Sequence, residues 1–170
     1  MAIKVDSLRM CYCTGTSGAR VMALRVMQFV ALVLTALALV PAGAHLFELP
    51  NKIGLSQDRY FIVQSIYRGW ALFGLVFLSA VASTLVLAIM LRGEGAAFWL
   101  SALAFLCMAS SLAIFFMWTY PANKATNNWS IVPANWEVLR TQWEYSHAAN
   151  AAMTFIAFCS VALSVLISPE

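Results

Sequence analysis

The sequence predicts an all-α integral membrane protein, a four-helix bundle in which each helix crosses the bilayer. Of its 170 residues, 62% are hydrophobic and 10% are charged, whereas soluble domains carry roughly a quarter charged residues. The apolar residues fall into four stretches, each close to the ~20 residues that a helix needs to span the hydrocarbon core. Helices are favoured because lipid offers no partner to unpaired backbone groups. We expect one membrane domain over residues 1–170.

The four apolar stretches define the spans in order along the chain. The expected spans are residues 26–47, 70–91, 96–118 and 147–167. An N-terminal segment, residues 1–25, precedes the first. Only Arg92-Gly93-Glu94-Gly95 separates the second from the third, so these two spans should form a tight antiparallel hairpin.

The first span has an alternative interpretation as a signal peptide. It closes with Ala42-Gly43-Ala44, which is similar to the small-residue site that signal peptidase cleaves. However, the apolar run is long for a signal peptide and the region before it is extended. We therefore expect the segment to be retained as a membrane helix.

The orientation depends on the basic residues that flank the spans. An even number of spans places both termini on one side, and the basic residues are equally divided between the two sides. The side of the termini has Lys4, Arg9, Arg20, Arg25 and Arg92, and the other side has Lys52, Arg59, Arg68, Lys124 and Arg140. Arg20 and Arg25 directly precede the first span, which usually dominates. We expect a multi-pass protein of a bacterial inner membrane with cytoplasmic termini.

Two longer connections should then lie on the non-cytoplasmic side. In the first, residues 48–69, we expect the helix to break at Pro50 and Gly54. The second, residues 119–146, becomes an amphipathic interfacial helix from Pro133 onwards. Helical spacing places four side chains on one face, namely Trp136, Arg140, Trp143 and His147. Tryptophan is typical of the headgroup region.

Composition and charge exclude several classes of function. The net charge of +3 is small and its carriers are scattered, which does not suit nucleic acid. No charge lies in the middle of a span, which argues against proton pumps, ion-coupled transporters and voltage sensors. Cys107 and Cys159 lie within apolar runs and are expected to be core residues. The pair Cys11-x-Cys13 has no partner ligands nearby and is a weak metal signal.

The residues best suited to metal binding or proton transfer lie at the end of the first span and the start of the fourth. His45 and Glu48 are three residues apart, as are Glu144 and His147, so each pair shares one helix face. Antiparallel spans would bring the pairs to one depth, and di-metal carboxylate sites use the same Glu-x-x-His spacing. This predicts a site for iron, copper, manganese or zinc.

A structural interpretation of the same residues stays open. Glu144 would form an ion pair with Arg140, four residues away, and Glu48 would pair with Lys52. Such surface pairs are common and contribute little. The two histidines would then be polar residues at the membrane boundary.

The second half of the chain resembles a known family. The residues that carry the resemblance are Pro121-Ala122-Asn123, Trp136, Leu139-Arg140-x-x-Trp143-Glu144 and His147. They are similar to those of small four-helix membrane proteins grouped with the fungal anthrone oxygenases. The resemblance implies oxidation of a lipophilic aromatic or quinone-like molecule, with Asn123, Arg140 and Trp143 as catalytic residues.

Two hypotheses of different classes follow. The first is a membrane oxidoreductase or oxygenase-like enzyme that acts on such a lipophilic small molecule, with the His/Glu site at the non-cytoplasmic face binding a metal or transferring protons. The second is a non-catalytic accessory or structural subunit that packs against partner subunits of a larger membrane complex. Small residues along the spans suit that packing. In both cases the lipid bilayer surrounds the protein.

Overall fold

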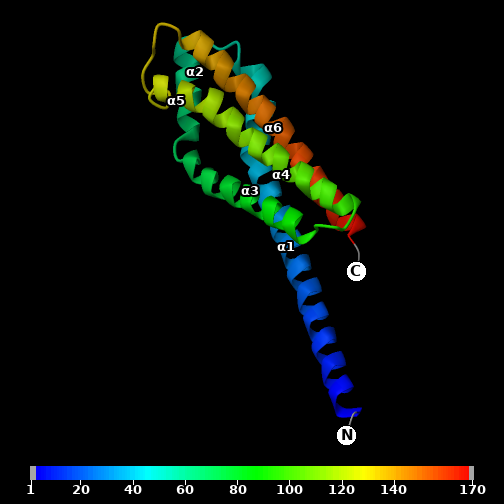
Figure 1. Cartoon of the computed structure of the whole chain (residues 1–170). Helices are drawn as coiled ribbons and strands as arrows, with labels where there is room; N and C mark the ends of the chain where they lie inside the picture. The colour runs from blue at the N-terminus through cyan, green and yellow to red at the C-terminus, as the bar shows by residue number, and fades with distance from the viewer. Residues whose placement is uncertain (1–2, 169–170) are drawn as a thin grey trace.

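The computed structural model is an all-α bundle built from four long helices (Figure 1). It describes the backbone of residues 3–168 and the side chains of residues 18–168. The long helices are α1 (Ile3–Lys52), α3 (Phe73–Met90), α4 (Ala96–Ile114) and α6 (Trp136–Ile167). Helix α6 packs against α4 and α1, and α3 packs against the same two helices. The four therefore form a closed ring of neighbours.

Four segments are long and apolar enough to cross a membrane, which confirms the predicted number of candidate spans. They are Gly18–Lys52, Trp70–Met90, Ala96–Ala125 and Trp136–Ile167. Gln28 near the start of the first donates a hydrogen bond to Ser168 just after the last, at 2.8 Å. The first span thus begins, and the last span ends, at the same end of the bundle, as an even number of spans requires. The Cys11-x-Cys13 pair lies outside the described side chains.

Helix α1 continues beyond the expected end of the first span. The sequence predicted a break at Pro50, but the helix contains this proline and ends at Lys52, just before Gly54. A proline removes one backbone hydrogen bond, and bundled membrane helices tolerate that loss. The longer helix keeps His45, Glu48 and Lys52 on one face, at spacings of three and four.

Helix α6 combines the expected interfacial helix and the fourth span in one unbroken helix of 32 residues. No proline or glycine occurs within Trp136–Ile167 to separate the two parts. At 1.5 Å per residue the helix is about 48 Å long, more than the ~30 Å of a hydrocarbon core. Its N-terminal part therefore extends past the hydrocarbon, and that part carries Glu137, Arg140 and Glu144.

Short elements close the end of the bundle at which α6 begins. The first connection forms α2 (Gln57–Gln64) and the 3₁₀ turns η1 (Ser65–Tyr67) and η2 (Trp70–Leu72). In the second, a π-helical turn, η3 (Phe115–Thr119), joins α4 to α5 (Tyr120–Ala125). The carbonyl of Trp118 in this wide turn accepts a hydrogen bond from Gln142 of α6 at 2.7 Å. This hydrogen bond holds the connection between α4 and α5 against α6.

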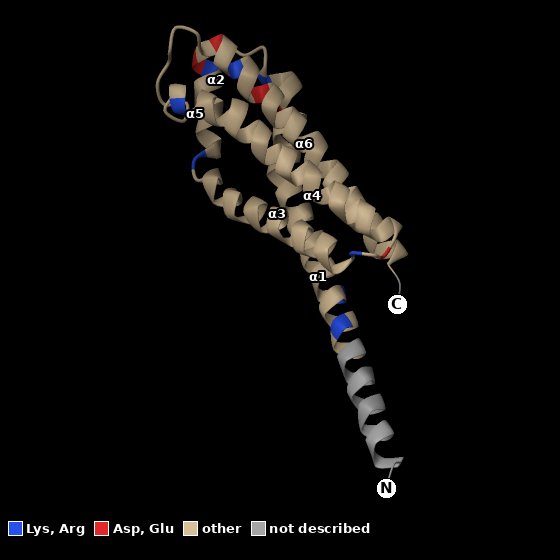
Figure 2. Ribbon diagram, viewed as in Figure 1, with Lys and Arg blue, Asp and Glu red and all other residues tan. Residues whose placement is uncertain are grey.

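Small side chains are frequent in the centre of the bundle, and many large apolar ones face outward. The buried alanines of the four long helices are Ala31, Ala38, Ala80, Ala88, Ala97, Ala104, Ala151 and Ala157. They let the helix backbones approach closely, which is how helices associate in lipid. Charged residues lie at the two ends of the bundle (Figure 2). At one end the α3–α4 turn needs left-handed backbone at Gly93 (φ +91°) and Gly95 (φ +55°), which glycine adopts without steric cost.

Candidate functional site

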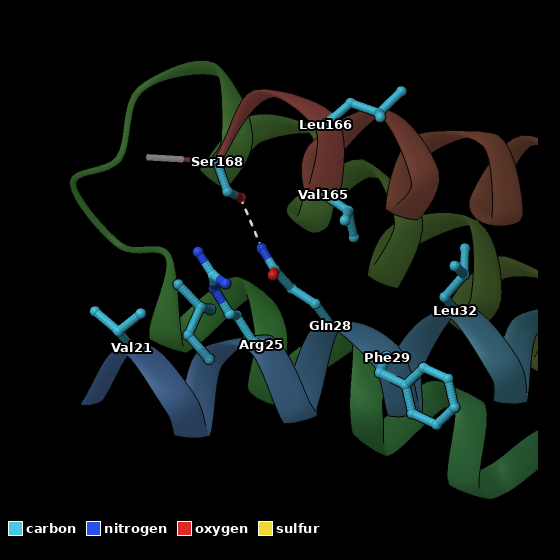
Figure 3. A pocket seen from close by; sticks show the side chains of 9 residues that line it. Val21, Arg25, Gln28, Phe29, Leu32, Val165, Leu166 and Ser168 are labelled. Carbon is cyan, nitrogen blue, oxygen red and sulfur yellow. Dashed lines mark hydrogen bonds between the residues drawn. The ribbon is translucent and has the colours of Figure 1, made fainter. Parts of the chain in front are cut away.

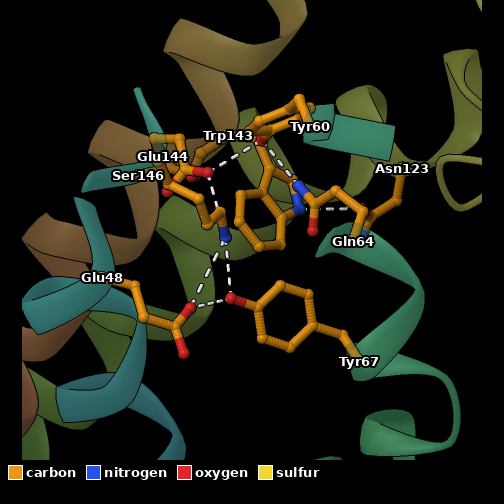
Figure 4. A network of polar contacts seen from close by, with 9 residues as sticks. Glu48, Tyr60, Gln64, Tyr67, Asn123, Trp143, Glu144 and Ser146 are labelled. Atoms are coloured by element: carbon orange, nitrogen blue, oxygen red, sulfur yellow. Dashed lines mark hydrogen bonds and ion pairs between the residues drawn. The ribbon is translucent and has the colours of Figure 1, made fainter. Parts of the chain in front are cut away.

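Polar and aromatic side chains converge where the end of α1, the α2–η1 connection and the start of α6 meet (Figure 4). We name this group the polar cluster. Its members are His45, Glu48, Lys52, Tyr60, Gln64, Tyr67, Trp143, Glu144 and His147. Both ion pairs formed among the described residues belong to it. The rest of the bundle's interior relies on uncharged contacts.

Lys52 lies at the centre of the polar cluster and is 3% exposed. Its Nζ is 3.1 Å from Glu144 Oε1 and 3.7 Å from Glu48 Oε2. Nζ also donates a hydrogen bond to the Tyr67 hydroxyl at 2.7 Å. It lies 4.7 Å from the ring centroid of Trp143, within the range of a cation–π contact. A buried ammonium is costly unless it is paired, and partners from three parts of the chain supply that pairing.

The two carboxylates each accept a hydrogen bond from a tyrosine. The Tyr60 hydroxyl donates to Glu144 Oε1 at 2.8 Å and accepts from Gln64 Nε2 at 2.6 Å. The Tyr67 hydroxyl donates to Glu48. Burial, followed by the adjacent carboxylate, raises the pKa of Tyr60 and of Tyr67 well above the ordinary tyrosine value. Both phenols therefore remain protonated donors at neutral pH.

The two histidines of the chain lie against each other inside an aromatic enclosure. The ring centroids of His45 and His147 are 4.1 Å apart. The Trp143 ring is 4.9 Å from His45 and 4.1 Å from His147. Tyr67 and Trp70 lie 4.5 and 5.5 Å from His45 on other sides. The His45 imidazole is thus buried between flat aromatic surfaces, and the half-buried His147 packs against it.

Three buried atoms of the polar cluster have no hydrogen-bond partner among the described residues. They are Gln64 Oε1, Glu144 Oε2 and His45 Nδ1. The carboxylate oxygen is an acceptor, and so is Nδ1 in the tautomer with its proton on Nε2. An unsatisfied buried polar atom costs about 1–3 kcal/mol, and native proteins satisfy nearly all such atoms. O–H donors from water or a ligand would satisfy such acceptors.

The predicted metal ligands reach one end of the bundle, but they do not form one ligand set. His45 and His147 are adjacent, as the metal hypothesis requires. Glu48 and Glu144 instead face Lys52, whose positive charge between them opposes a metal cation. Among residues 18–168, no group of three or more His, Cys, Asp or Glu is arranged to hold a metal ion. The metal site stays a prediction that requires both carboxylates to leave Lys52.

The structural interpretation is correct for one ion pair and wrong for the other. Glu48 pairs with Lys52 at 3.7 Å, as the spacing suggested. Glu144 pairs with Lys52 rather than with Arg140. The guanidinium of Arg140 instead donates to the carbonyl of Leu55 at 2.8 Å, because the loop before α2 folds against it.

The three residues that the family resemblance implied lie in or beside the polar cluster. The indole nitrogen of Trp143 donates to Asn123 Oδ1 at 2.8 Å, which ties α6 to α5. The Arg140 guanidinium carbon lies 4.6 Å from the ring centroid of Trp136. Trp143 contacts both histidines, whereas Asn123 and Arg140 orient their neighbours. Their catalytic roles stay predictions.

Four central residues were missed from the sequence as members of the site, namely Lys52, Tyr60, Gln64 and Tyr67. Lys52 was placed in a loop because a break was expected at Pro50. Tyr60, Gln64 and Tyr67 are spaced four and three residues apart, which puts them on one helical face. That spacing was a usable signal for a polar face within the first connection.

Comparison with known proteins identifies no relative: no family model, no curated protein and no solved structure matches this chain.

Proposed function

We propose that this integral membrane protein is a small oxidoreductase-type enzyme that binds a lipophilic phenol or hydroquinone at the polar cluster. The proposal is carried by one observation, that the polar cluster contains unsatisfied buried acceptors, among them Glu144 Oε2 and His45 Nδ1. They lie among aromatic side chains at the membrane boundary. Ionisable groups placed there are expensive and commonly functional.

A phenol or hydroquinone matches this environment in two ways. Its hydroxyl group donates a hydrogen bond to one of the two acceptors, Glu144 Oε2 or His45 Nδ1. Its ring packs against the aromatic surfaces of Tyr67, Trp70 and Trp143, in the edge-on and offset arrangements that aromatic rings favour. A lipophilic molecule also reaches this depth directly from the bilayer.

The residues of the cluster account for a proton-transfer step. The substrate O–H bond breaks, its electron pair stays on the substrate oxygen, and the proton passes to Glu144 or His45. The Lys52 ammonium, 3.1 Å from Glu144, stabilises the resulting phenolate in a medium of low dielectric. A phenolate gives up electrons more readily than a phenol, so this step prepares the substrate for oxidation by a separate electron acceptor.

Ligand binding tests the proposal directly. Purified protein in lipid nanodiscs is titrated with a short-chain benzohydroquinone and with the matching quinone, and tryptophan fluorescence is followed. The hydroquinone should bind more tightly, because only it donates a hydrogen bond. Glu144→Gln should weaken hydroquinone binding about tenfold or more, the effect of losing a hydrogen bond to a charged group. Ser101→Ala at the other end of the bundle is the control and should retain full affinity.

The outcomes separate this proposal from both alternatives. Equal affinity for the two ligands, or no binding by folded wild-type protein, overturns it. Stoichiometric metal in the purified protein, lost in both His45→Ala and His147→Ala, would replace it with the metal-dependent form of the enzyme hypothesis. If Glu144→Gln lowers the melting temperature without changing ligand affinity, the cluster is structural and the accessory-subunit hypothesis takes its place.

A further inference from the structure

The end of the bundle opposite the polar cluster carries a groove that the proposed function does not use. A cavity of about 500 Å³ opens between the start of the first span on α1 and the end of α6 (Figure 3). Its polar lining consists of Arg25, Gln28 and Ser168. The apolar lining includes Leu32 and Val165. Polar and apolar walls in one groove indicate an amphipathic ligand.

The polar part of the groove is held in place by the fold. Gln28 is 7% exposed, and its amide donates to Ser168 Oγ at 2.8 Å across the gap between α1 and α6. Arg25 lies beside Gln28 at the mouth of the groove, with an exposed side chain (Figure 3). A cation at the mouth and a fixed amide behind it suit a ligand with a negative headgroup.

Among the described residues, the charge around the groove is predominantly positive. The described charged residues at this end of the bundle are Arg20, Arg25, Arg92 and Glu94 (Figure 2). The described residues at this end thus carry three positive charges and one negative charge. Basic pockets between membrane helices are known binding sites for anionic lipid headgroups.

The depths of the residues that line the groove match the positions of the headgroup and the acyl chains of a lipid. Arg25 precedes the apolar part of α1, at the level where headgroups lie. Leu32 follows seven residues later, about 10 Å deeper along the helix, where acyl chains begin. Val165 of α6 forms the facing wall.

We propose that this groove binds one anionic phospholipid. Its phosphate contacts Arg25 and Gln28, and the first part of an acyl chain runs along Leu32 and Val165. The site is independent of the polar cluster, and it would couple the stability of the α1–α6 contact to the anionic lipid content of the membrane.

Thermal unfolding of the full chain in dodecyl maltoside tests this proposal. Dioleoyl phosphatidylglycerol should raise the melting temperature more than dioleoyl phosphatidylcholine at the same concentration. Inorganic phosphate, which has no acyl chain, should have little effect. Arg25→Gln should weaken phosphatidylglycerol binding about fivefold, as expected for one basic residue near a headgroup. Arg20→Gln removes the same charge outside the groove and should leave the binding unchanged.

A second variant tests the apolar part of the groove. Val165→Phe fills the groove and should reduce phosphatidylglycerol binding, measured by the number of lipids retained in native mass spectrometry. The proposal is overturned if the two phospholipids stabilise the wild type equally, or if inorganic phosphate stabilises it as much as phosphatidylglycerol. It is also overturned if Arg20→Gln weakens binding as much as Arg25→Gln.

Discussion

The two ends of the bundle hold α6 against its neighbouring helices by different kinds of contact. At the polar cluster, Lys52 is buried between two carboxylates, and Glu144 is fully buried with it. At the opposite end the contacts among the described side chains are uncharged. Ser101 of α4 and Ser164 of α6 share a hydrogen bond of 2.8 Å, and Gln28 bonds to Ser168.

The difference shows that charged and neutral contacts stabilise a membrane bundle to different degrees. A buried ion pair is strongly coupled, because removal of one partner leaves the other as an uncompensated charge. A neutral hydrogen bond within a bundle contributes only about 0.6 kcal/mol on average. The cluster end should therefore be the rigid end, and the groove end should adapt more easily to a bound lipid.

The largest expected effect comes from the cation at the centre of the cluster. Lys52→Met should lower the free energy of unfolding by about 3–5 kcal/mol, because it leaves Glu144 buried without its partner. The measurement is an SDS titration of the purified protein followed by circular dichroism. Lys124→Met, an exposed lysine at the same end, is the control and should stay within about 0.5 kcal/mol of the wild type. Equal effects of the two substitutions would contradict the central role of Lys52.

The two carboxylates of the cluster should differ in importance. The Glu144 side chain is fully buried and that of Glu48 is 36% exposed. Glu144→Gln should therefore cost about 1.5–3 kcal/mol, the range for a hydrogen bond to a charged group. Glu48→Gln should cost less than about 1 kcal/mol, as partly exposed pairs do. The same SDS titration measures both stability losses. A larger loss for Glu48→Gln than for Glu144→Gln would show that Glu48 is the more important anion.

The groove end should respond weakly to loss of a contact. Ser101→Ala removes the hydrogen bond to Ser164 and should cost about 0.6–1 kcal/mol, several times less than Lys52→Met. Thermal unfolding in detergent, with both variants in one series, provides the comparison. A loss as large as that of Lys52→Met would show that the two ends are equally coupled.

The smallest effect is on tyrosine ionisation. Because the pKa values of Tyr60 and Tyr67 are raised, the folded protein should hold these two protons above pH 10, where tyrosines in the unfolded chain lose theirs. Stability from this source should be constant below about pH 10 and fall as the pH rises further, since the unfolded state then binds fewer protons. Absorbance at 295 nm measures the phenolates. Tyr60→Phe and Tyr67→Phe should leave the titration of the folded protein near pH 10 unchanged, and a reduced step would contradict the buried assignment.

Much of the architecture could be predicted because lipid imposes simple rules. Four apolar stretches give four helices, and the glycines of Arg92-Gly93-Glu94-Gly95 give a tight turn. The two His/Glu pairs were correctly placed at one end, because antiparallel first and last spans must meet there. The limits of α1 and α6 were less predictable, since Pro50 is tolerated within α1 and nothing in the sequence divides α6.

The sequence by itself determined the four apolar helices and the confinement of charge to their ends, because burial of a charge or of an open backbone in hydrocarbon is too costly for any alternative. Only the tertiary structure decided which partner each ionisable group has. Lys52 pairs with both carboxylates because α1 continues two residues past Pro50 and α6 places Glu144 beside it. These long-range contacts depend on where three separate segments meet, which no local spacing encodes.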